Sequence, residues 1–145
     1  MTLETRTYSQ LIAGEVLAVE TLLEGRPRGY DPADIDEADD EHTAYRDALN
    51  ELELEPDYDT DDNDPLTDYL NNTCLEVTWY KSGTKTRAEI LRTCGGPRCE
   101  ITRDSIDGSM IEIRTYETGA PVDTIRVWAP IMADTLDMLA SELAQ

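Results

Sequence analysis

Most of the negative charge of this chain lies in one segment. Residues 31–68 hold 17 acidic residues and one basic residue, Arg46, while the whole 145-residue chain has 32 acidic and 12 basic residues and a net charge of −20. A run of this composition is typical of disordered, solvated chain. Apolar residues nevertheless recur from Ile35 to Leu52 at spacings of three, four or seven, which predicts a helix with one narrow apolar face and acidic side chains over the rest.

The acidic helix has a predicted start and end. Asp31-Pro32 combines an N-cap residue with a proline at the first helical position, and Pro56 ends the pattern before an acidic loop at residues 57–64. Carboxylates four residues apart on such a helix lie roughly 6 Å apart, on the scale of successive phosphates along a DNA strand. The candidate partner-binding residues are the acidic side chains of this helix and loop: Asp34, Asp36, Glu37, Asp40, Glu41, Asp47, Glu51, Glu55, Asp57, Asp59, Asp61, Asp62 and Asp64.

The hydrophobic pattern predicts the other elements. Ser9 as an N-cap and the apolar stripe after it predict a helix at residues 9–24, and Asp64-Pro65 predicts a short helix that closes at Asn71-Asn72. From Leu75 onward the period changes to two, which predicts strands at residues 75–80, 84–93, 98–103, 109–117 and 121–128. Pro130 begins a last helix, whose residues expected to face inward are Ile131, Leu136, Leu139 and Leu143.

Short connections between the strands make neighbouring strands antiparallel. The sequence therefore predicts an α+β fold with N-terminal helices, a five-stranded antiparallel meander and a C-terminal helix. We expect a single domain over residues 1–145, composed of a helical acidic half (1–72), a sheet (73–129) and a closing helix (130–145).

The charge excludes several classes of partner. A net charge of −20 repels nucleic acid and anionic membrane, so we expect no direct contact with either and favour a basic protein partner. The chain has no apolar run of the ~18 residues that a membrane helix needs and no secretory signal, which predicts a cytoplasmic protein. The acidic coat of a halophile would cover the whole surface, so the concentration of charge in one segment argues against that interpretation.

Residues that could carry catalysis are scarce. His42 is the only histidine, and a lone histidine beside carboxylates is expected to be a solvated surface residue. No glycine-rich phosphate loop, nucleophile motif or zincin motif occurs. We therefore expect a protein that is not an enzyme and that uses no cofactor.

Two metal sites can be considered. Cys74, Cys94, Cys99 and His42 make a four-ligand zinc set, but the spacing favours small reduced thiols in strands, with a Cys94–Cys99 disulfide as the alternative in an oxidising compartment. The loop from Asp57 to Asp68 resembles an EF-hand at its first, third and fifth positions, but Asp62 stands where that loop needs glycine. Weak Ca²⁺ binding is therefore kept as an alternative, and no dedicated metal site is expected.

A small, single-domain, strongly acidic chain with carboxylate rows on helices and a mixed sheet resembles the DNA-mimic inhibitors of phages and mobile elements. These include anti-restriction and anti-CRISPR proteins, which occupy the nucleic-acid channel of their targets. The resemblance implies a non-enzymatic inhibitor whose partner is a basic CRISPR effector or restriction nuclease. The stretch from Ala88 to Ile101 also resembles a hairpin of uncharacterised phage and plasmid proteins, and that likeness implies no activity. The alternative is an acidic immunity-type or antitoxin-type protein that neutralises one basic partner.

Two questions stay open at this stage. The arginines on or near the strands either pair with acidic residues of the same chain or contact an acidic or RNA surface of a partner; they are Arg87, Arg98, Arg103, Arg114 and Arg126. The net charge favours a monomer, whereas a sheet edge or an exposed Trp128 would build a small homo-oligomer.

Overall fold

The computed structural model describes residues 8–35, 38–93, 98–117 and 119–144. Its helices are α1 (Tyr8–Leu23), α2 (Asp40–Glu51), α3 (Pro65–Asn72) and α4 (Pro130–Leu143), with a short 3₁₀ helix, η1 (Ser105–Asp107). Its strands are β1 (Glu76–Ser82), β2 (Lys85–Thr93), β3 (Arg98–Asp104), β4 (Met110–Glu117) and β5 (Ala120–Trp128). The strands form one antiparallel sheet in chain order, so the predicted α+β fold is confirmed.

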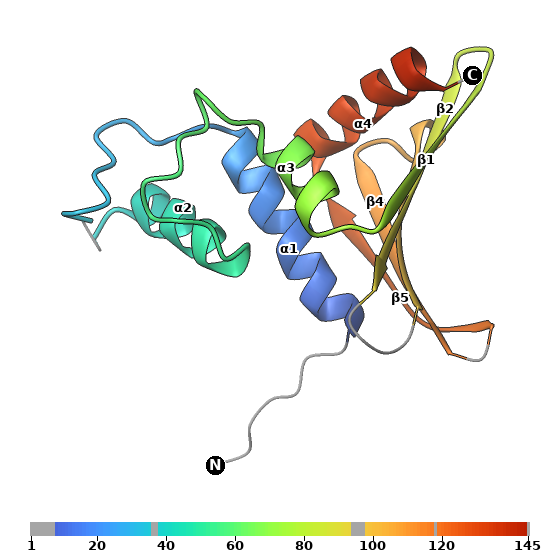
Figure 1. Cartoon of the computed structure of the whole chain (residues 1–145), viewed down its shortest axis with the longest axis horizontal. Coiled ribbons are helices and arrows are strands. Elements are labelled where there is room, and N and C mark those ends of the chain that lie inside the picture. Colours follow the sequence, from blue (N-terminus) through green and yellow to red (C-terminus); the bar gives the residue numbers. More distant parts are fainter. Residues whose placement is uncertain (1–7, 36–37, 94–97, 118, 145) are drawn as a thin grey trace.

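The four helices lie on one side of the sheet (Figure 1), and α1 and α4 pack directly against it. The main core combines α1, α3, α4 and the inner face of the sheet, where Ile90, Ile101, Ile111 and Ile113 are fully buried. Ile101 and Ile113 have polar residues on both sides in the sequence, as expected for a sheet with one covered face. The part of the chain that the structure describes has no helix long and apolar enough to cross a membrane.

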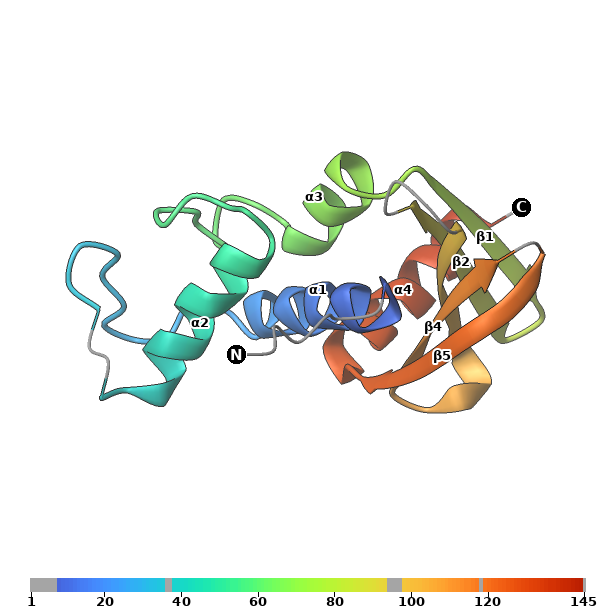
Figure 2. The same cartoon turned by 90° about the horizontal axis from the view of Figure 1, so that it is seen from below.

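A second, smaller core holds α2 against α1. It consists of Ala18 and Leu22 from α1, Tyr30 from the following loop, and Tyr45, Ala48 and Leu49 from α2. Tyr30 and Tyr45 meet edge to face with ring centroids 4.7 Å apart. Because α1 is the element on which α2 mainly packs, the acidic helix extends to the end of the molecule away from the sheet (Figure 2).

The start of the acidic helix was predicted wrongly. The helix begins at Asp40 because Asp39 is its N-cap, with a carboxylate that accepts hydrogen bonds from Glu41 N (2.9 Å) and His42 N (3.3 Å). Asp31 instead stabilises an isolated turn by accepting a hydrogen bond from Ala33 N at 2.9 Å. Both aspartates satisfy the same sequence rule, and the helix follows the second one, where Tyr45, Ala48 and Leu49 come to pack against α1.

The helix also ends earlier than predicted. Glu53 has a positive φ of 56°, Glu53 N donates to the carbonyl of Asn50 (3.1 Å), and Leu54 N donates to that of Leu49 (2.9 Å). These two bonds form a Schellman motif, in which the residue at the position of Glu53 is usually glycine. The chain therefore leaves the helix before Pro56.

Replacing Glu53 by glycine is expected to stabilise the fold by about 0.5–1 kcal/mol, because a side chain at this φ is strained and glycine is not. Urea unfolding measures the change. Glu53→Ala is the control, since it removes the same charge but keeps a Cβ atom. Equal stabilisation by both variants would assign the effect to charge instead of backbone strain.

Two smaller predictions also need correction. Ser9 does not cap α1; it lies inside the helix, fully buried, with its hydroxyl oxygen 2.5 Å from that of Thr115. In α4, Leu136 faces the core as predicted, but Ile131 and Leu143 are 37% and 54% exposed. Residues from the first turn of α4, Met132 and Ala133, are buried in their place.

Candidate acidic interface

The structure places only part of the predicted set on a helix. Of the eight candidates expected there, α2 carries Asp40, Glu41, Asp47 and Glu51, all with exposed or half-exposed side chains. Asp34 lies in a bend before α2 and Glu55 follows its end, and both are exposed. Asp36 and Glu37 lie outside the described residues. The predicted phosphate-like row is therefore shorter than the sequence indicated.

The five loop candidates fall into two groups. Asp59 and Asp64 bind their own backbone: Asp59 accepts from Asp61 N at 2.9 Å, and Asp64 caps α3 by accepting from Leu66 N at 3.0 Å. Such turn and cap bonds fix the path of the loop. The exposed side chains of Asp57, Asp61 and Asp62 complete the loop's acidic surface.

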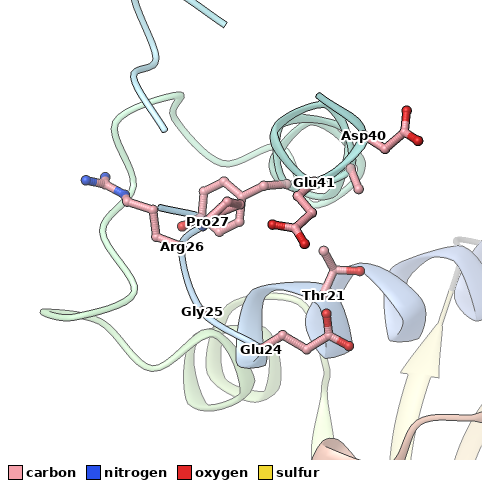
Figure 3. Close-up of a pocket in the computed structure, with 9 residues that line it drawn as sticks. Thr21, Glu24, Gly25, Arg26, Pro27, Asp40 and Glu41 are labelled. Atoms are coloured by element: carbon pink, nitrogen blue, oxygen red, sulfur yellow. The ribbon is translucent and has the colours of Figure 1, made fainter. Parts of the chain in front are cut away.

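A cavity of about 410 Å³ lies between the end of α1 and the start of α2. Figure 3 shows the side chains of Glu24 and Glu41 extending into this space on either side of Thr21, while Asp40 points away from it. Glu24 was not among the predicted site residues. Glu24 follows α1, and its nearest charged neighbour in the sequence is Arg26, so no local cluster of carboxylates marks it as a site residue. The packing of α2 on α1 brings it into the site.

A second cavity, of about 560 Å³, lies on the other side of the same helix end. It is lined by residues of the acidic loop from Thr60 to Pro65, by Leu22 and Leu23, and by Thr135 of α4. Gly25 lines both cavities, so α2 and the acidic loop flank the end of α1 from two sides. That end carries the negative pole of the helix dipole, and the last turn of α1 has no basic residue.

We call α2, residues 57–64 and Glu24 together the acidic end. The one basic residue of segment 31–68, Arg46, has a guanidinium nitrogen 3.6 Å from a carboxylate oxygen of Asp47. Because 17 acidic residues of this segment share one arginine, the acidic end keeps a large excess of negative charge. The mutual repulsion of these carboxylates is a cost that a basic partner would relieve.

The sheet is neutralised internally. Arg87 pairs with Glu89 (2.9 Å), Arg98 with Glu100 (2.7 Å), and Arg126 with Glu112 (3.2 Å), which also pairs with Arg114. Arg103 is 2% exposed and pairs with Asp137 of α4 at 2.8 Å. Of the two alternatives left open by the sequence, pairing within the chain accounts for all five of these arginines.

The calcium alternative gains no support from the loop geometry. Asp68, the last EF-hand position, accepts a 2.6 Å hydrogen bond from the Tyr58 hydroxyl. Burial and this bond raise the pKa of Tyr58, so the stability that the bond contributes is fully present below the ordinary tyrosine pKa of about 10 and is lost as the pH rises from there through the raised pKa. Within the described residues, no three His, Cys, Asp or Glu side chains converge as metal ligands do.

His42 is not the solvated residue that was predicted. It is 8% exposed, packs edge-on to Tyr30, and has its Nε2 atom 3.0 Å from the carbonyl oxygen of Arg28. Since a carbonyl only accepts, Nε2 carries the proton in this bond. His42 therefore ties the start of α2 to the loop after α1.

Both described cysteines, Cys74 and Cys99, are buried. Cys74 is 9% and Cys99 0% exposed. Burial raises the pKa of Cys74 to about 12, so its thiol stays protonated and unreactive at neutral pH. Cys94, and with it the proposed disulfide and the full zinc set, lies outside the described residues.

Comparison of the chain with protein families, with curated proteins and with solved structures finds no match.

Proposed function

We propose that this chain is a non-enzymatic inhibitor that binds the basic nucleic-acid channel of a bacterial defence nuclease, either a CRISPR effector or a restriction enzyme, through its acidic end. The observation that carries the proposal is the contrast between the two ends of the molecule. Arginines of the sheet are paired with carboxylates of the same chain, whereas segment 31–68 has 17 acidic residues and one arginine. Most of the net charge of −20 therefore belongs to this one segment.

The folded scaffold supports a role in recognition. A disordered acidic tail would lose conformational entropy on binding, whereas α2 is held in place by the small core around Tyr45 and by the His42 bond to Arg28. Basic side chains of a partner could enter the cavity that Glu24 and Glu41 border. Release of the counterions around the acidic end would favour the complex, as it does when proteins bind DNA.

The experiment is affinity capture from the lysate of a bacterium that carries CRISPR and restriction systems, with elution by a salt gradient. We expect a nuclease complex that elutes progressively as salt rises and is displaced by duplex DNA. Nuclease activity inhibited by the chain should return when DNA is added in excess. A complex that resists both salt and DNA would contradict the proposal and favour an immunity-type partner with an apolar interface. Capture of no nuclease would also contradict it.

A further inference from the structure

The two edges of the sheet differ in their protection against pairing with another chain. β5 contains Pro121, and its pairing with β4 shifts register between Thr115 and Tyr116, so that Val122 is left out of the ladder. Proline and β-bulges are common protections of an edge strand, as are lysines. β1 carries Lys81 but no proline, and it pairs in continuous register with β2 from Glu76 opposite Leu91 to Ser82 opposite Lys85; the ladder is irregular just before it, where Leu75 N also donates to the carbonyl of Leu91 at 2.9 Å.

The free backbone groups of β1 can be identified from its hairpin. A two-residue turn joins Ser82 to Lys85, and residues that flank such a turn exchange both of their backbone hydrogen bonds. Counting back from Ser82, every second residue of β1 likewise exchanges backbone hydrogen bonds with β2. Val77, Trp79 and Lys81 therefore direct their N–H and C=O groups away from the sheet, as a template for a further strand.

The side chains of this edge complement those of a second copy. When two β1 strands pair antiparallel with Trp79 opposite its own copy, Glu76 of one chain lies opposite Ser82 of the other. Lys85 is the cross-strand neighbour of Ser82 on β2. The carboxylate of Glu76 from one chain and the ammonium group of Lys85 from the other therefore face each other across the small side chain of Ser82. Both residues are exposed, and neither takes part in a salt bridge within the part of the chain that the structure describes.

Apolar surface and a cavity lie along the same edge. Leu75, directly before β1, is 66% exposed, and Tyr80 is 45% exposed. A cavity of about 510 Å³ is lined by Tyr80, Ser82 and Lys85, among others, where Glu76 of the second chain would arrive. Half-buried Trp79 would gain an aromatic neighbour in its own copy.

We propose that β1 is a dimerisation edge, through which two copies of this chain pair antiparallel in the register that places Trp79 at the two-fold axis. The sheet then continues from one copy into the other. Because β1 and α2 lie at opposite ends of the molecule (Figure 1), the acidic end stays accessible in the dimer. The proposal is independent of the proposed function.

Sedimentation velocity over a wide range of protein concentrations tests the proposal. We expect a reversible monomer–dimer equilibrium in the wild-type chain. Lys81→Pro should weaken it at least about tenfold, since proline removes an edge N–H and leaves the bonds to β2 intact. Arg126→Pro is the matched control on β5. Ala129 N, just after β5, bonds to the carbonyl of Ser109, just before β4, so every second residue back from Ala129 bonds to β4 and Arg126 N lies between them, facing away from the sheet. Equal weakening by both variants, or a monomer at every concentration, would overturn the proposal.

Charge variants test the register without placing proline in the strand. Glu76→Lys and Lys85→Glu should each weaken the dimer several-fold, because each puts like charges across Ser82. The double variant E76K/K85E should restore the wild-type dissociation constant. A double variant as weak as the singles would rule out this register.

Discussion

Replacing Asp40, Asp47 and Glu51 by Asn, Asn and Gln is expected to weaken binding to the nuclease by about 100-fold. Each exposed ion pair across such an interface contributes about 1 kcal/mol, and ~3 kcal/mol corresponds to that change in the dissociation constant. The three residues share α2 and none of them is buried, so the fold should be little affected. Isothermal titration calorimetry at low and at physiological salt would measure the effect and its salt dependence.

A control with the same charge change separates the acidic end from net charge. Asp107, Asp134 and Glu142 are exposed carboxylates outside segment 31–68, and changing them to Asn, Asn and Gln should alter affinity by less than about threefold. If both triple variants weaken binding equally, long-range attraction and not the acidic end holds the complex. If neither does, the proposed interface is wrong.

The elements of the sheet were predictable because their signals are local. Alternation from Val77 onward and glycine turns such as Gly83-Thr84 define each hairpin without reference to the rest of the chain. The start of α2 was not predictable in this way, because Asp31 and Asp39 are equally good N-caps in the sequence. The choice between them depends on which residues reach Leu22 and Ala18 of α1, which is a tertiary property.

The candidate site was predictable as a region but not as a surface. Composition identified segment 31–68, yet Asp59, Asp64 and Asp68 turned out to be bound within the chain. Glu24 joined the site from the turn that follows α1. Charge patterns along a sequence show where carboxylates gather, whereas their partners and directions depend on packing that the pattern does not contain.

The partners of the buried carboxylates of α1 could not be predicted from the local sequence either. Glu15 of α1 accepts hydrogen bonds from Tyr69 of α3 (2.6 Å) and pairs with Arg92 of β2 (3.1 Å). These residues are 54 and 77 positions from Glu15 in the sequence. Both carboxylates on the inner face of α1, Glu15 and Glu20, thus satisfy distant elements, although a helical pattern would assign them to solvent.

Glu20→Ala is expected to destabilise the protein by about 3 kcal/mol. The N-cap of α4, Ala129, has no side chain to bind the first N–H groups of that helix, and the buried carboxylate of Glu20 does so from α1. It accepts from Ile131 N at 3.0 Å and from Met132 N at 2.7 Å. Removing it leaves two amides at a helix N-terminus without acceptors and a cavity in the core, and each effect costs more than 1 kcal/mol.

Urea unfolding followed by circular dichroism measures this loss, and Glu20→Gln separates its two parts. Glutamine fills the same volume and its carbonyl oxygen accepts one bond, so we expect about half the destabilisation. Glu24→Ala is the control, since it removes the same charge one turn further along the chain, at the mouth of a cavity instead of in the core. It should change stability by less than about 0.5 kcal/mol. A Glu20→Ala variant as stable as Glu24→Ala would show that water replaces the carboxylate at the start of α4.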